Sequence, residues 1–155
     1  MIQLLRPIRI LIIEDDNDRL ARLKAMLPEW AKPVPTLSAC RAIGLLERDS
    51  SRKNGGKDTY AGILLDHDLV CHAVNHADSS REGRDVAKSI VQNVTPRVPV
   101  LIHSMNFTHS RTMVEWLEWE GFSVTRIPMS LLTKERMDEW LEEVRDNWED
   151  QEGEQ

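Results

Sequence analysis

Short apolar runs alternate with amphipathic segments along the chain. The first run, residues 8–13 (IRILII), is dominated by β-branched residues and stops at a group of acids, which indicates a buried strand. Leu20, Leu23 and Leu27 then recur at helical spacing, and Pro28 indicates the end of that helix. The same order repeats along the chain. The pattern predicts strands at residues 8–13, 33–37, 60–65, 98–102 and 122–127, and helices that carry the apolar positions of 20–27, 42–46, 86–91, 113–117 and 137–148.

This alternation of strands and helices favours an α/β fold. Successive βαβ units give a parallel sheet with helices on both faces. The predicted strands are almost wholly apolar, as expected when both faces of a sheet are covered. We therefore expect a flavodoxin-like three-layer sandwich with a five-stranded parallel sheet of order 2-1-3-4-5.

The length and composition fit one globular domain. The chain has 155 residues, of which 41% are hydrophobic and 30% charged, as in soluble globular proteins. We expect a single domain at residues 1–148 and an acidic, disordered tail at 149–155. No apolar run approaches the ~20 residues of a membrane helix, and nothing at the N-terminus resembles a signal peptide. Cys40 and Cys71 have no CxxC partner, so we expect a reduced, cytoplasmic protein.

The charge balance bears on the partners of the protein. Twenty basic and 26 acidic residues give a net charge of −6. Generic binding to a nucleic-acid backbone needs a cationic face, so we expect no such binding, and we expect no membrane partner. An acidic protein can still hold a local site for a single phosphate group.

Acids, imidazoles and a hydroxyl follow the first, third and fourth predicted strands. In an open parallel sheet, ligands bind beyond the carboxyl ends of the strands where the strand order reverses, and these three strands would lie side by side there. Crowded carboxylates stay ionised together only if they share a cation or a proton. Oxygen ligands suit Mg²⁺ or Mn²⁺, and coordinating histidines would shift the preference toward softer metals. The residues are Glu14, Asp15 and Asp16, then Asp66, His67 and Asp68, then His103 and Ser104.

Several of these residues also fit a structural role. Asp16 is as suited to cap the first helix as to bind a metal. His67 follows Asp66 in an extended segment, so its side chain points away from that of Asp66, and a supporting hydrogen bond is as well founded as catalysis. The same two readings apply to His103 beside Ser104. A histidine that faces the site would suit acid–base work near neutral pH.

The motifs ILIIEDD, ILLDHDL and VPVLIHS resemble the first, third and fourth strands of response-regulator receiver domains, and the likeness covers nearly the whole chain. The resemblance implies that Glu14 and Asp15 bind a metal and that Asp66 is in the phospho-acceptor position. It also implies that Asp68 lends a backbone carbonyl to the metal and that Ser104 contacts the phosphoryl group.

The chain departs from receivers at the fifth strand and resembles a divergent branch of them. Receivers place a lysine before a proline there, whereas this chain has Ile127, and strand alternation turns Arg126 to the opposite face. The pair LDHDL and IHSMN is similar to the cyclic-phosphate-processing receiver-like domains. In that branch the marked positions would be Asp15, Asp16, Asp66, His67, Asp68, His103, Ser104 and Asn106, although Asn106 equally suits a turn.

Two functions from different classes follow. The first is metal-dependent ring opening of a cyclic phosphodiester on a phosphate-containing small molecule or a nucleotide end. The alternative is a stand-alone receiver or pseudo-receiver that signals through protein partners with Asp66 as phospho-acceptor; a binding module that only holds a cation is a third reading. The resemblance also implies a homodimer face formed by the helix at 113–117, the strand at 122–127 and the helix at 137–148. The assigned residues are Asp66, His103 and His67 for catalysis, Ser104 and Asn106 for phosphate, and Glu14, Asp15, Asp16, Asp66 and Asp68 for the metal.

Overall fold

The five predicted strands form one parallel sheet. The computed structural model describes residues 6–66, 83–105 and 107–153. Within this part of the chain the strand order is β2-β1-β3-β4-β5, and every neighbouring pair is parallel. The predicted flavodoxin-like architecture is therefore confirmed. The strands are β1 (Ile8–Ile13), β2 (Ala31–Thr36), β3 (Gly62–Leu65), β4 (Val100–Ile102) and β5 (Val124–Arg126).

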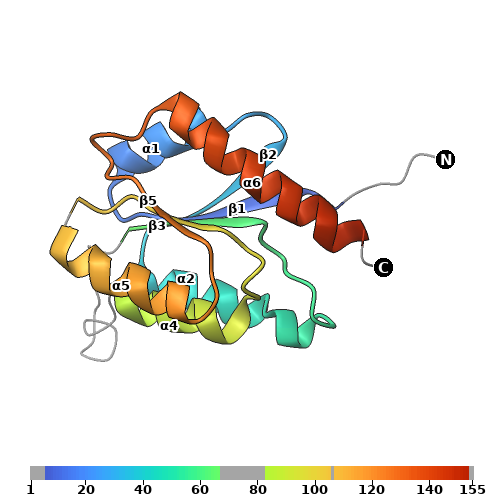
Figure 1. The fold of residues 1–155 in the computed structure, drawn as a ribbon. Coiled ribbons are helices and arrows are strands. Elements are labelled where there is room, and N and C mark those ends of the chain that lie inside the picture. Colours follow the sequence, from blue (N-terminus) through green and yellow to red (C-terminus); the bar gives the residue numbers. More distant parts are fainter. Residues whose placement is uncertain (1–5, 67–82, 106, 154–155) are drawn as a thin grey trace.

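Helices cover both faces of this sheet (Figure 1). α1 and α6 lie on one face, whereas α2, α4 and α5 lie on the other and pack against one another. A single 3-10 turn, η1, follows α2. The bounds are α1 (Asn17–Met26), α2 (Ala39–Arg48), η1 (Ser51–Lys53), α4 (Gly83–Asn93), α5 (Phe107–Trp119) and α6 (Lys134–Gly153).

The core has two halves because successive strand residues point to opposite faces of the sheet. In β1, Ile10 and Ile12 pack with the apolar residues of α1 and α6. Leu11 and Ile13 pack with those of α2, α4 and α5. All four side chains are fully buried, so β1 is covered on both sides as the sequence predicts.

α6 approaches the sheet closely at Gly62, the first residue of β3. A Cβ atom placed on Gly62 would lie 2.9 Å from Cη2 of Trp140 and 3.0 Å from Cγ2 of Val144. Such distances are well inside van der Waals contact, so the glycine is needed for α6 to sit on β3. This contact fixes β3, the strand that Asp66 directly follows.

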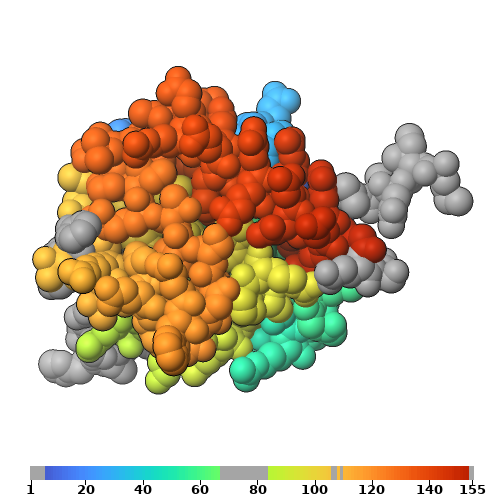
Figure 2. Space-filling model, viewed as in Figure 1, coloured from blue at the N-terminus to red at the C-terminus, as the bar shows by residue number. Residues whose placement is uncertain are grey.

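The C-terminal segment differs from the prediction. The acidic composition of 149–155 predicts a disordered tail, but α6 continues to Gly153. Gln151 donates to Oδ2 of Asp58 at 3.1 Å and accepts from its backbone N–H at 3.2 Å. The carboxylate of Glu152 pairs with Arg6. Figure 2 shows α6, in red, lying along the body of the molecule. These partners are polar and distant in sequence, so the apolar pattern does not reveal them.

Three strands begin later than predicted. Tyr60, Val98 and Phe122 fall within predicted strands, yet each precedes the paired residues and belongs to the core beside α2, α4 and α5. These residues are apolar because they are buried in the core, although they lie outside the paired part of the sheet. At the edge, β2 contains Pro33 and Pro35, which a strand with one unpaired side tolerates. In the described part of the chain, no helix has the length and apolar character needed to cross a membrane.

Candidate functional site

The chemistry-bearing residues lie at the carboxyl ends of β1, β3 and β4, which are neighbours in the sheet. Glu14 follows β1, Asp66 follows β3, and His103 and Ser104 follow β4. The backbone N–H of Asp66 donates to the carbonyl of Ile13 at 3.1 Å, so the ladder extends past the strands and holds the site residues level. The side chains of Glu14, Asp66, His103 and Ser104 are all buried, with 0 to 2% of their surface exposed.

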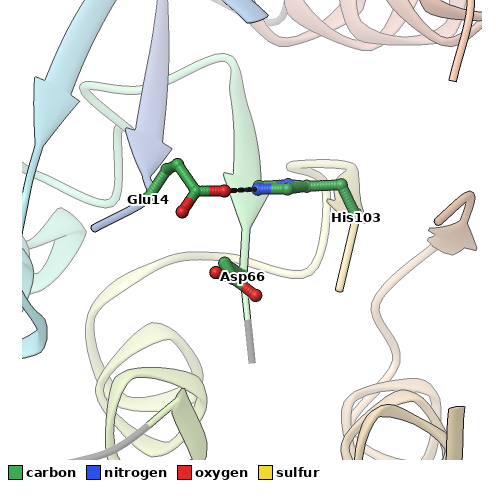
Figure 3. Close-up of side chains that lie close together, drawn as sticks. All are labelled: Glu14, Asp66 and His103. Atoms are coloured by element: carbon green, nitrogen blue, oxygen red, sulfur yellow. Dashed lines mark hydrogen bonds and ion pairs between the residues drawn. The ribbon is translucent and has the colours of Figure 1, made fainter. Parts of the chain in front are cut away.

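Three of these side chains converge, and we call Glu14, Asp66 and His103 the acid–histidine cluster. Each offers one ligand atom, and these atoms all lie within 4.8 Å of one another. Nε2 of His103 is 3.0 Å from Oε1 of Glu14. Figure 3 shows these two side chains pointing toward one another from β1 and β4, with the carboxylate of Asp66 beside them. His103 therefore faces the site, which decides between the two orientations that the sequence left open for its side chain.

The acid–histidine cluster suits a hard divalent cation. Its two carboxylates are the ligand type that Mg²⁺ and Mn²⁺ prefer, with water completing the shell, whereas coordination by the imidazole would shift the preference toward softer metals. Burial excludes solvent, so the negative charges need a cation nearby to remain ionised. The donor set therefore fits the metal that the sequence predicts.

The structure adds a residue that sequence reasoning missed, Arg19. Its Nε lies 3.0 Å from Oε1 of Glu14, and its Nη2 lies 3.1 Å from Oε2. Nη2 is also 3.6 Å from Oδ1 of Asp15 and 3.5 Å from Oδ2 of Asp66. Arg19 is in the first turn of α1, where the helix dipole disfavours a cation. The sequence offered one signal for this role, a basic residue in the first helical turn just after a run of acids.

The charge state of Glu14 follows from its surroundings. Burial alone would raise the pKa of this carboxyl. The hydrogen bonds from His103 and from the backbone N–H of Asp16, together with the charges of His103 and Arg19, instead lower the pKa to about 2. Burial opposes the charge of Arg19 as well, but the nearby Glu14 raises the pKa of the guanidinium. Glu14 and Arg19 are thus both charged across the physiological range.

The ionised Glu14 determines how His103 is protonated. A carboxylate only accepts hydrogen bonds, so Nε2 of His103 carries the hydrogen in their 3.0 Å contact. In the neutral ring, Nδ1 then keeps its lone pair. Within the described residues, Nδ1 is buried and has no hydrogen-bond partner. The imidazole is therefore oriented through Nε2, and the lone pair of its buried Nδ1 is unused within the described residues.

The structure describes some of the remaining residues that the sequence analysis discussed, and others lie outside it. Asp15 lies at the edge of the site, where it faces Arg19. Asp16 is exposed, and its side chain accepts from the backbone N–H of Arg19 at 2.9 Å, so it takes the capping role that the sequence left open. Arg126 donates to Oγ of Ser110 at 2.6 Å, on the face away from Ile127. Three further assignments lie outside the described residues: His67, Asp68 and Asn106.

Comparison with solved structures identifies the fold. The signal receiver domain of a putative Luxo repressor protein from Vibrio parahaemolyticus aligns with a TM-score of 0.66 at 20% identity, over 97% of this chain and 99% of that one. The response regulator domain of Thermotoga maritima CheB gives 0.60 at 18%, over 93% and 98%. The Mn²⁺-bound form of response regulator Rcp1 gives 0.59 at 18%, over 86% and 89%. The fold is that of a response-regulator receiver domain.

The family is narrower than the fold. The family model of the cyclic-phosphate processing receiver domain matches residues 10–119. The chain belongs to this family, and the matched region contains the whole acid–histidine cluster and Arg19. No curated protein sequence matches the chain significantly.

Proposed function

We propose that this receiver-fold protein opens cyclic phosphodiesters with the help of Mg²⁺ or Mn²⁺. The observation that supports it best is the convergence of Glu14, Asp66 and His103 within 4.8 Å at the reversal point of the sheet. The family description points to cyclic phosphates as the substrate class. The substrate would be a phosphate-containing small molecule or a nucleotide end.

The carboxylates of Glu14 and Asp66 would hold the cation, with Asp15 at the rim and Asp68 as a further predicted ligand, while Asp16 caps α1. A bound Mg²⁺ or Mn²⁺ supplies neutralisation of phosphate oxygens and makes a nearby water more acidic. The response regulator Rcp1, which shares the fold, has a Mn²⁺-bound form, and this makes Mn²⁺ a sensible probe.

His103 is the proposed proton carrier. Glu14 fixes the ring through Nε2, and Nδ1 is left to accept a proton from the attacking water. The water oxygen forms a bond to phosphorus, one ring P–O bond breaks, and the departing alkoxide receives that proton from His103, which leaves a phosphomonoester. The hydroxyl of Ser104 would donate to a phosphoryl oxygen, as would Asn106, and His67 is the other predicted acid–base residue.

A second function is favoured by the position of Asp66. It directly follows β3, is 2% exposed and lies on a fold shared with signal receiver domains. Asp66 would accept phosphate, and the protein would act through protein partners or a homodimer at the α5–β5–α6 face. Trp119, the last residue of α5, is 86% exposed. Against phosphorelay stands Ile127, which is buried in the core where receivers carry a lysine.

One experiment separates these functions. The protein is incubated with Mn²⁺ or Mg²⁺ and a panel of 2′,3′- and 3′,5′-cyclic nucleotides, and phosphomonoester is measured by ³¹P NMR. We expect turnover that is lost with EDTA and falls at least ~100-fold in Asp66→Asn and His103→Ala. Asp18→Asn makes the same chemical change at an exposed position of α1 and should leave turnover intact.

The signalling alternative predicts a different result in the same set of experiments. Incubation with acetyl phosphate, followed by intact-mass measurement, would show a stable addition that Asp66→Asn abolishes. Acyl phosphate without turnover of any cyclic nucleotide would reject the enzymatic proposal in favour of the receiver. If the protein binds Mn²⁺ but shows no turnover and no phosphorylation, the result would favour the third reading, a module that only holds a cation.

A further inference from the structure

Arg19 competes for the oxygen atoms that a divalent cation would need. Its guanidinium contacts Glu14 through two nitrogens and also reaches Asp66, so it touches both carboxylates of the acid–histidine cluster. The three acids around it, Glu14, Asp15 and Asp66, carry three negative charges against its single positive charge. The site is thus partly neutralised by a side chain of the protein itself.

Four donor nitrogens crowd the carboxylate of Glu14 while Arg19 is present. Oε1 lies 3.0 Å from both Nε2 of His103 and Nε of Arg19. Oε2 accepts from the backbone N–H of Asp16 at 3.0 Å and from Nη2 of Arg19 at 3.1 Å. A carboxylate offers about four lone-pair directions, and four donors already approach this one. A cation that coordinates Glu14 must therefore displace one of them.

Of these donors, the guanidinium is the one that can leave. The N–H of Asp16 is backbone at the cap of α1, and the side chain of His103 is only 1% exposed. The side chain of Arg19 is 35% exposed and is attached by a long, flexible stem. Its Nε is buried, yet it has no well-aligned hydrogen bond within the described residues despite its 3.0 Å approach to Glu14. Both features favour displacement of Arg19.

We propose that Arg19 is a built-in counter-ion that occupies the cation site in the metal-free protein and is displaced when a divalent cation binds. This inference rests on the proposed metal site. It makes Arg19 a residue that lowers metal affinity, because binding must break its contacts with Glu14 and Asp66. A residue that merely oriented the ligands would have the opposite effect, since its loss would weaken binding.

The test is a titration with Mn²⁺ alone, in which electron paramagnetic resonance measures the concentration of the free ion. We expect Arg19→Gln to bind Mn²⁺ about tenfold more tightly than the wild type, because removing a contact to a charged group relieves a penalty of that order. Arg22→Gln removes the same charge from an exposed position of the same helix, and it should change the affinity by less than about twofold. Without metal, Arg19→Gln should have a lower melting temperature, and saturating Mn²⁺ should raise it further than it raises that of the wild type.

A second measurement follows the displacement directly. In the wild type, addition of diamagnetic Mg²⁺ should shift the Nε–Hε signal of Arg19 in ¹H–¹⁵N spectra and speed its exchange with water. Arg22 should show neither change. Equal or weaker Mn²⁺ binding by Arg19→Gln, or an unmoved Arg19 signal at saturation, would overturn the counter-ion role and leave the metal site standing. No Mn²⁺ binding by the wild type, Arg19→Gln or Arg22→Gln would overturn the metal site and the counter-ion role together.

Discussion

Replacing Glu14 by Gln tests the electrostatics on which the site depends, in metal-free protein. The side chain is fully buried, and its partners hold the pKa at about 2, against an ordinary value of 4.5. A displacement of this size corresponds to about 3 kcal/mol of folding free energy at neutral pH. A lowered carboxyl pKa contributes stability that is fully present above pH 4.5 and is lost as the pH falls toward 2. More than half of that contribution should be gone at pH 3.

The assay is urea unfolding in EDTA at pH 7, 5, 4 and 3, with the wild type and Glu14→Gln measured together. The variant should be less stable at pH 7 by about 3 kcal/mol, and the gap should narrow by about 2 kcal/mol at pH 3. Glu115→Gln makes the same change at a side chain that is 64% exposed, so it should differ from the wild type by less than about 0.5 kcal/mol throughout. A gap between wild type and Glu14→Gln that stays constant from pH 7 to pH 3 would refute the reasoning.

Two further predictions concern the support of the site. Gly62→Ala should lower the free energy of unfolding by about 1–3 kcal/mol, because its Cβ would meet Trp140 at 2.9 Å. Gly44→Ala, in an open helical position, should raise the free energy of unfolding by up to about 1 kcal/mol. Equal effects of the two substitutions in chemical denaturation would contradict this reasoning. Burial and the hydrogen bond to Asp49 raise the pKa of the Tyr60 hydroxyl above its ordinary value of 10. The protonated hydroxyl therefore contributes to folding stability below pH 10, and this stability is lost as the pH rises above 10. Tyr60→Phe should cost about 1 kcal/mol at pH 8 and remove that part of the alkaline decline, and parallel curves from pH 8 to pH 11 would count against it.

The placement of Glu14, Asp66 and His103 was accessible from the sequence for a clear reason. Each directly follows a short apolar run, and the carboxyl ends of neighbouring parallel strands meet at one edge. Pattern and topology together therefore bring residues far apart in the sequence to one site. Neither argument fixes the side-chain direction beyond the last ladder residue, so the orientation of His103 needed the structure.

Long-range polar partners were beyond the pattern. The contact of Arg19 with Asp66 is one of them, because the apolar stripe of α1 is unaffected by where its cationic side chains reach. The final turn of α6 is anchored by Asp58 and Arg6, which lie more than 90 residues earlier in the chain. Such contacts leave no periodic signal, because a charged or amide side chain that finds a buried partner looks in sequence like one that faces solvent.

The source of positive charge distinguishes this site from the receivers that it resembles. After β5, Ile127 packs with the apolar side chains of α1 and α6, and Arg126 is directed to Ser110 of α5. The guanidinium beside Glu14 and Asp66 comes from the first turn of α1 instead. A change at the carboxylates of the site would therefore reach α1 through the side chain of Arg19. The segment after β5 meets the site through the backbone instead, because the N–H of Met129 donates to the carbonyl of His103 at 3.0 Å.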